Sequence, residues 1–119
     1  MSLRISNLKK NGDADNEYIL LEATADVNIS NYAIVDKTFD KDGSVSNIHK
    51  HYYRFPSKDV KKGEYVSLHT GVGNDRISKL KSGEKLHMFF WGSKTSFWND
   101  DKIEKAELLK VSTIDTKLA

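Results

Sequence analysis

The segment HMFFWGSKTSFWND, residues 87–100, gathers the side chains best suited to binding a ligand. Aromatic rings stack on nucleic-acid bases and sugar rings, and lysine amines neutralise phosphate charge. The residues that would do this are Phe89, Trp91, Lys94, Phe97 and Trp98. Asp100 and Asp101 follow directly and would repel phosphate. Stacking on a nucleic acid or a polysaccharide is therefore one prediction for this segment.

The same segment has a second interpretation, in which its rings fill the hydrophobic core. If residues 85–92 form a strand, Met88 and Phe90 lie on one face, and Phe89 and Trp91 lie on the other. One face must then belong to the core. The other is either covered by the loop that carries Phe97 or exposed as a binding patch, and the sequence leaves both alternatives open.

Three further patterns could bind ions or phosphate, but each has a simpler structural interpretation. His49 and His51 share a strand face and could hold a metal with His69, but two histidines alone are a weak signal and a polar strand face explains them better. Asp40 and Asp42 precede a tight-turn glycine and lack the spaced glycine and glutamate of a calcium loop. The run HTGVGND lacks the third glycine of a dinucleotide fingerprint. We therefore predict no metal and no cofactor.

Nucleophilic catalysis requires an activated side chain held beside a base. The sequence has no cysteine and no glycine-serine-glycine elbow, so neither common nucleophile arrangement is present. Pairs of carboxylates are plentiful, but a sequence gives no distance between them. We predict that the protein is not an enzyme.

Length and charge indicate a single domain over residues 1–119. The 19 basic and 17 acidic residues are interspersed, which favours solubility over nucleic-acid binding. No stretch is apolar enough for a signal peptide or a membrane span, so we expect neither in this chain and no membrane insertion. The compartment and the oligomeric state are not indicated.

Short runs rich in Val, Ile, Tyr and Phe recur between turn residues, which is typical of an all-β domain. Strands are predicted over residues 3–8, 17–23, 28–39, 49–56, 64–69, 85–92, 102–112 and 114–118. Residues 104–109 have a short helix as their alternative. Turns are expected at Asn11-Gly12 and Asp42-Gly43, and a loop over 79–85. Strand number and spacing favour a β-sandwich.

In order and spacing, the runs NEYILLE, ISNYAIVD, YYRFP, VKKGEYVSLHTGVG, FFWGS and FWND resemble the lamin tail domain family over residues 3–109. The most specific part is Tyr53-Arg54-Phe55-Pro56, followed by Val60, Gly63, Val66 and Gly71-Val72-Gly73. The chain departs from the family at Tyr32, where a tryptophan is usual, and near Asp101, where a glycine is usual. The resemblance implies an immunoglobulin-like antiparallel β-sandwich.

The resemblance also implies a function. Domains of this family act as binding or scaffolding modules in nuclear lamins, and in bacteria they occur beside secreted nucleases, phosphatases and surface proteins. We therefore predict a non-enzymatic module that binds another protein through sheet edges and end loops. The alternative is a nucleic-acid- or polysaccharide-binding domain that uses the aromatic and lysine residues of 87–100.

Overall fold

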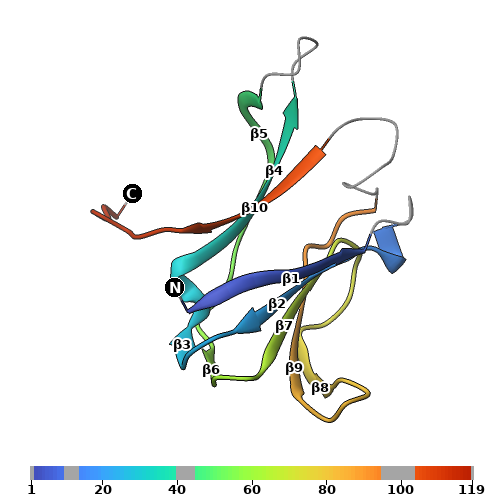
Figure 1. Ribbon diagram of the computed structural model, residues 1–119. Coiled ribbons are helices and arrows are strands. Elements are labelled where there is room, and N and C mark those ends of the chain that lie inside the picture. The colour runs from blue at the N-terminus through green and yellow to red at the C-terminus, as the bar shows by residue number, and fades with distance from the viewer. Residues whose placement is uncertain (1, 10–13, 40–44, 95–103, 119) are drawn as a thin grey trace.

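The computed structural model describes residues 2–9, 14–39, 45–94 and 104–118, and most of its regular structure is β-strand. The larger sheet has five strands in the order β1-β2-β7-β9-β8 (Figure 1). Their bounds are β1 (Leu3–Lys9), β2 (Tyr18–Ala23), β7 (Tyr65–His69), β8 (Arg76–Lys79) and β9 (Lys85–Phe90). The pairs are antiparallel except β7 with β9, which is parallel because the chain forms β8 at the sheet edge before it returns beside β7.

The smaller sheet has three antiparallel strands in the order β10-β4-β5. Their bounds are β4 (Tyr32–Phe39), β5 (Val45–Arg54) and β10 (Glu104–Lys110). Short elements connect the two sheets: β3 (Val27–Asn28) pairs with β6 (Asp59–Val60), and two 3-10 turns cover Ala14–Asn16 and Ile29–Asn31. Asn28 caps the second turn by accepting a hydrogen bond from the Ser30 N–H.

The hydrophobic core lies between the two sheets. Strand β2 alternates between buried and partly exposed residues, so Ile19 and Leu21 point into the core. Strand β4 contributes Tyr32 and Ile34 from the opposite sheet. Burying each large aliphatic side chain contributes roughly 1.5–3 kcal/mol. The facing apolar surfaces therefore hold the two sheets together.

The all-β sandwich predicted from the sequence is confirmed. Strands occur where residues 3–8, 17–23, 49–56, 64–69 and 85–92 predicted them, and residues 104–110 form a strand, not a helix. Residues 32–35 are all buried, as expected for a strand that is apolar on both faces. Gly63 takes a positive φ of 89° in the turn before β7, a conformation that glycine adopts without strain. The parallel β7/β9 pair is a departure from the predicted antiparallel arrangement.

Two strand predictions were wrong, for opposite reasons. Residues 114–118 form no strand, and Ile114 is 97% exposed, so its apolar side chain has no sheet to pack against. Strand β8 was missed because all of its side chains are exposed and it shows no apolar alternation. The turns predicted at Asn11-Gly12 and Asp42-Gly43 lie outside the described residues. No helix in the described part of the chain is long and apolar enough to cross a membrane.

Candidate binding site at the uncovered end of the larger sheet

The two sheets differ in width, and this difference leaves part of the larger sheet uncovered. Tyr53 and Phe55, at the end of β5, face β9: the Phe55 and Phe89 ring centroids are 5.4 Å apart, and those of Tyr53 and Trp91 are 5.7 Å apart. Strand β8 pairs with the edge of β9 that faces away from β7, and it therefore lies beyond the ring contacts between β5 and β9. The inner face of the sheet is consequently open at β8.

Ile77 marks the uncovered face. It pairs with His87 across the β8/β9 ladder, so the two side chains lie on the same side of the sheet. His87 in turn shares its face with Phe89, two residues along β9, which belongs to the core. Ile77 nevertheless remains 52% exposed. An apolar side chain on the core side of the sheet is thus left without a covering strand.

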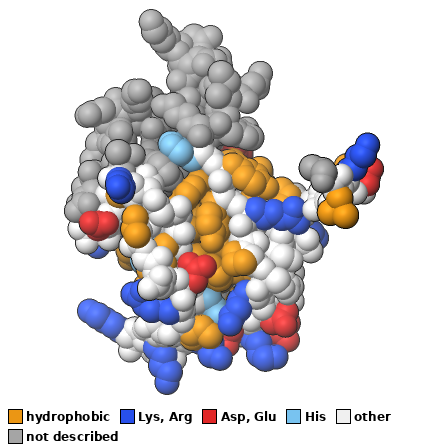
Figure 2. Space-filling model, turned by 180° about the vertical axis from the view of Figure 1, so that it is seen from behind, with side chains coloured by type: hydrophobic (Ala, Val, Ile, Leu, Met, Phe, Trp, Pro, Cys, Tyr) orange, Lys and Arg blue, Asp and Glu red, His pale blue; other side chains and the backbone are white. Residues whose placement is uncertain are grey.

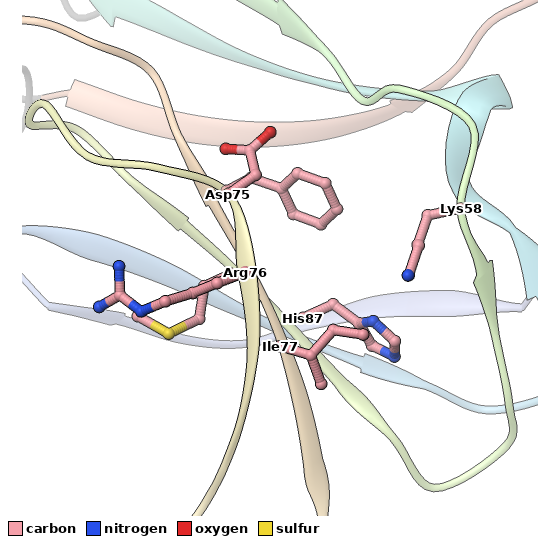
Figure 3. Close-up of a pocket in the computed structure, with 7 residues that line it drawn as sticks. Lys58, Asp75, Arg76, Ile77 and His87 are labelled. Carbon is pink, nitrogen blue, oxygen red and sulfur yellow. The ribbon is translucent and has the colours of Figure 1, made fainter.

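A pocket with a volume of about 390 Å³ lies over this surface (Figure 3). We call it the β8–β9 pocket; its lining residues are Lys58, Asp75, Arg76, Ile77, His87, Met88 and Phe89. The volume is within the range of pockets that hold a small ligand or a large side chain. In Figure 3 the side chain of Lys58 points toward the His87 ring from the opposite wall.

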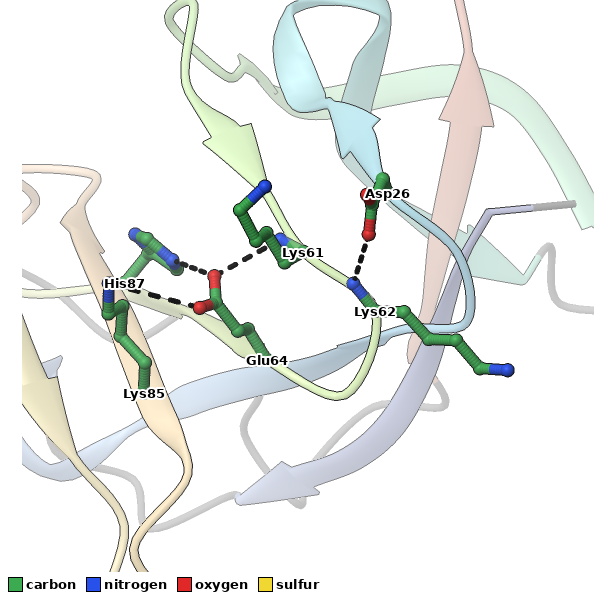
Figure 4. Close-up of polar contacts among 6 residues, drawn as sticks. All are labelled: Asp26, Lys61, Lys62, Glu64, Lys85 and His87. Carbon is green, nitrogen blue, oxygen red and sulfur yellow. Dashed lines mark hydrogen bonds and ion pairs between the residues drawn. The ribbon is translucent and has the colours of Figure 1, made fainter.

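Glu64 fixes the orientation of the His87 ring. The Nε2 atom of His87 lies 2.9 Å from Glu64 Oε1, which also accepts a 3.1 Å hydrogen bond from the Lys61 N–H, and Lys85 Nζ lies 3.9 Å from Glu64 Oε2 (Figure 4). The hydrogen bond from His87 is the largest of the effects that lower the pKa of Glu64 below its ordinary value. An ionised carboxylate only accepts hydrogen bonds, so Nε2 carries the proton that it donates to Glu64.

The turn that carries Glu64 is itself held in place. Gly63 takes a left-handed conformation, and the Glu64 N–H donates to the Lys61 carbonyl over 2.9 Å. The Lys62 N–H donates to Asp26 Oδ1 over 2.8 Å, which ties the turn to the start of β3 (Figure 4). Glu64 therefore reaches His87 from a fixed backbone.

The second ring nitrogen of His87 differs from the first. His87 is only 3% exposed, and its Nδ1 atom is buried without a hydrogen-bond partner among the described residues. A buried polar atom that lacks a partner costs about 1–3 kcal/mol relative to a satisfied one. The wall of the β8–β9 pocket thus contains a polar atom whose hydrogen-bonding capacity is unused.

Asp75 and Arg76 line the pocket where β8 begins, and the side chain of Arg76 points to the opposite face of the sheet from Ile77 and His87 (Figure 3). Asp75 Oδ1 accepts a 3.1 Å hydrogen bond from the Phe90 N–H, and the Arg76 guanidinium lies 5.3 Å from the centroid of the Phe90 ring. Burial, together with the negative charge of Asp75, raises the pKa of Tyr53 to about 12. These contacts tie the segment before β8 to the end of β9.

The residues predicted to form an aromatic patch have different environments. Phe89 is 5% exposed and belongs to the core, so the core interpretation holds for this ring. Trp91 is partly buried against the core, with the His51 ring edge-on at 6.2 Å. Lys94 is exposed. Phe97 and Trp98 lie outside the described residues.

Of the histidines predicted as candidate metal ligands, His51 and His69 fall in separate places, and the side chain of His49 lies outside the described part of the structure. His51 contacts Trp91, whereas His69 stacks on Phe90 at 4.9 Å and lies 3.0 Å from Ser67 Oγ. Burial lowers the pKa of His69, and the nearby charge of Arg76 lowers it further. Within the described residues, no three histidine or acidic side chains are arranged to hold a metal ion.

Sequence reasoning did not identify the β8–β9 pocket. The only available signal was His87, a polar residue at an inward position of a strand whose neighbours in that row are apolar. Its partner Glu64 and the lining residue Lys58 come from a separate turn and connection, which strand periodicity does not place. A comparison with models of known protein families found no match, and neither did a comparison with curated proteins.

Proposed function

We propose that this protein is a non-enzymatic binding or scaffold module whose partner is another protein. The observation that carries the proposal is the outer edge of β8. In the sheet order β8 is an edge strand, all four of its residues are exposed, and it borders the β8–β9 pocket. An edge strand offers unpaired backbone N–H and C=O groups, which a partner strand or loop satisfies by extending the sheet.

The charge of β8 favours a different protein over a second copy. Arg76 and Lys79 lie on the edge strand, and lysines on an edge are a common device against pairing between identical sheets. The same charges attract an acidic segment. The resemblance to lamin tail domains supports the same kind of function, because those domains act as binding and scaffolding modules.

A pull-down with a matched pair of variants tests this proposal. Ile77→Asp places a charge on β8 itself, on its uncovered face. Ile114→Asp makes the same change at a site that is 97% exposed and far from β8 in sequence. Wild type and Ile114→Asp should capture the same protein from a lysate of the source organism, and Ile77→Asp should lose it. Failure of wild type to capture any protein over a range of salt concentrations would contradict the proposal.

A second candidate is binding of a nucleic acid or a polysaccharide. The observation in its favour is the exposed Lys94, three residues after the partly buried Trp91. Titration of the tryptophan fluorescence with single-stranded DNA and with a soluble polysaccharide separates the two ligands. DNA affinity should fall steeply with salt, whereas sugar affinity should stay constant. If neither polymer changes the emission, this candidate is excluded.

A further inference from the structure

We propose that the β8–β9 pocket is a binding site for a tyrosine side chain that lies in an acidic segment of the partner protein. The inference rests on the proposed function and adds the chemistry of the partner. It depends on three features: the unused Nδ1 atom of His87, the amine of Lys58 and the apolar surface between them. Each feature selects a property of the ligand.

His87 selects a hydrogen-bond donor. Because Nε2 donates its proton to Glu64 over 2.9 Å, Nδ1 is the ring nitrogen left to accept a hydrogen bond, and it does so while it carries no proton itself. This atom is buried and has no partner among the described residues. An O–H or N–H group from a ligand would satisfy it, once the flexible side chain of Lys58 moves aside to admit that group.

Lys58 restricts the choice of donor. Its side chain points toward the His87 ring in Figure 3, and an ammonium group only donates hydrogen bonds. The ligand group should therefore donate to His87 and accept from Lys58 at the same atom. A hydroxyl does both, whereas the indole N–H of tryptophan only donates.

The remaining surface selects an aromatic body for that hydroxyl. Ile77 and Phe89 line the pocket together with His87, and a volume of about 390 Å³ has room for a phenol ring. A serine or threonine would leave the side chain of Ile77 exposed. A phenol covers it and also gains ring contacts. Tyrosine combines the hydroxyl with this apolar body.

The charges around the pocket indicate acidic neighbours for the tyrosine. The hairpin over residues 75–85 contains two acidic and four basic residues. The basic residues are Arg76, Lys79, Lys81 and Lys85. In Figure 2, several Lys and Arg side chains gather at the lower end of the molecule, with Asp and Glu side chains among them. Complementary charge on the partner would speed association and fix its register.

Peptide titration followed by NMR tests the inference, because it measures weak binding and locates it. The probes are acetyl-Asp-Glu-Tyr-Glu-Asp-amide, the same peptide with phenylalanine in place of tyrosine, and a version with four lysines in place of the acidic residues. The protein variant is His87→Gln. The glutamine amide can still donate to Glu64, but no acceptor remains at the position of Nδ1. The variant therefore removes the proposed contact and keeps the contact to Glu64.

The tyrosine peptide should shift the amide signals of Lys58, Ile77 and His87 and bind roughly 3- to 10-fold more tightly than the phenylalanine peptide. His87→Gln should abolish that difference, and the lysine peptide should bind more weakly than the acidic one. Equal binding of the tyrosine and phenylalanine peptides to wild type would overturn the inference, since a buried water would then be the partner of Nδ1. This contrast needs no folded variant.

The tyrosine site and the proposed function can fail separately. If the acidic tyrosine peptide does not bind but Ile77→Asp still loses a protein that wild type captures, the tyrosine site is wrong and protein binding at β8 stands. If the peptide shifts signals only outside the pocket, the tyrosine site is likewise wrong.

Discussion

His87 Nε2 and Glu64 Oε1 lie 2.9 Å apart and join β9 to the turn that precedes β7. The pKa of Glu64 is lowered in the folded protein, chiefly by this hydrogen bond. Its contribution to stability is therefore present above the ordinary carboxyl pKa of 4.5 and is lost as the pH falls through the lower folded value. The pair links the wall of the pocket to the acid stability of the fold.

Replacing Glu64 with glutamine tests this link. Glu64→Gln keeps the size of the side chain but loses the ionised acceptor of His87, so we expect a loss of about 1 kcal/mol at pH 7. Below pH 4.5, wild type should approach the variant, because its own carboxylate becomes protonated. Urea denaturation from pH 7 to pH 3 measures both, with Asp115→Asn, at an exposed site, as the control. Parallel curves for wild type and Glu64→Gln over this range would contradict the expectation.

Tyr53 predicts a change in stability at alkaline pH. Its pKa is raised to about 12, whereas an unfolded tyrosine ionises near 10. Its contribution is full below pH 10 and is lost as the pH rises through about 12. Tyr53→Phe should therefore lose less stability than wild type over this interval in denaturation experiments. Tyr52→Phe is the matched control, because Tyr52 is 52% exposed and lies on the other face of β5.

At Gly71, a larger residue should cause a steric clash. A Cβ atom at this position would lie 2.8 Å from Asp15 Oδ1 and 2.9 Å from the Ala14 carbonyl oxygen, so the backbone of the first 3-10 turn would have to move. Gly71→Ala should cost about 1–3 kcal/mol of unfolding free energy. Val72→Ala changes a neighbouring residue that is 67% exposed and should cost less than about 0.5 kcal/mol. Equal costs for the two variants would show that the close approach at Gly71 is relieved cheaply.

Phe89 predicts the largest loss of stability. Its ring is 5% exposed and packs against Phe55, so Phe89→Ala should destabilise the protein by about 3–5 kcal/mol. Phe90, the next residue, lies on the opposite face, where it contacts His69 and Arg76, and it is less buried. Phe90→Ala should therefore cost clearly less. Chemical denaturation of both variants checks the order, and a larger loss for Phe90→Ala would refute the assignment of Phe89 to the core.

The sequence was sufficient for much of the fold because strand periodicity records burial. Residues 17–23 and 32–35 carry the apolar pattern of strands that face or lie within a core, and they became β2 and the buried start of β4. Strand β8 carries no such pattern, because it is held by backbone pairing with β9 and has no covering layer. Strand β8 can therefore be recognised only from its pairing with β9 in the folded sheet.

The candidate site could not be predicted for a related reason. His87 and Ile77 are brought together by the β8/β9 register, and Glu64 reaches His87 from a turn 23 residues earlier in the chain. No local pattern encodes such contacts. The aromatic segment was conspicuous in the sequence, yet Phe89 serves the core.

The measurement that tests protein binding at β8 most directly is site-specific photo-crosslinking. A photoreactive amino acid replaces Ser78 on β8 in one variant and Ser6 on β1 in another; both serines are exposed, and their strands form the two opposite edges of the same sheet. In cells of the source organism, the probe at position 78 should form a discrete crosslink to a second protein, and the probe at position 6 should not. A crosslink from position 6 alone, or none from either position, would contradict a protein contact at β8.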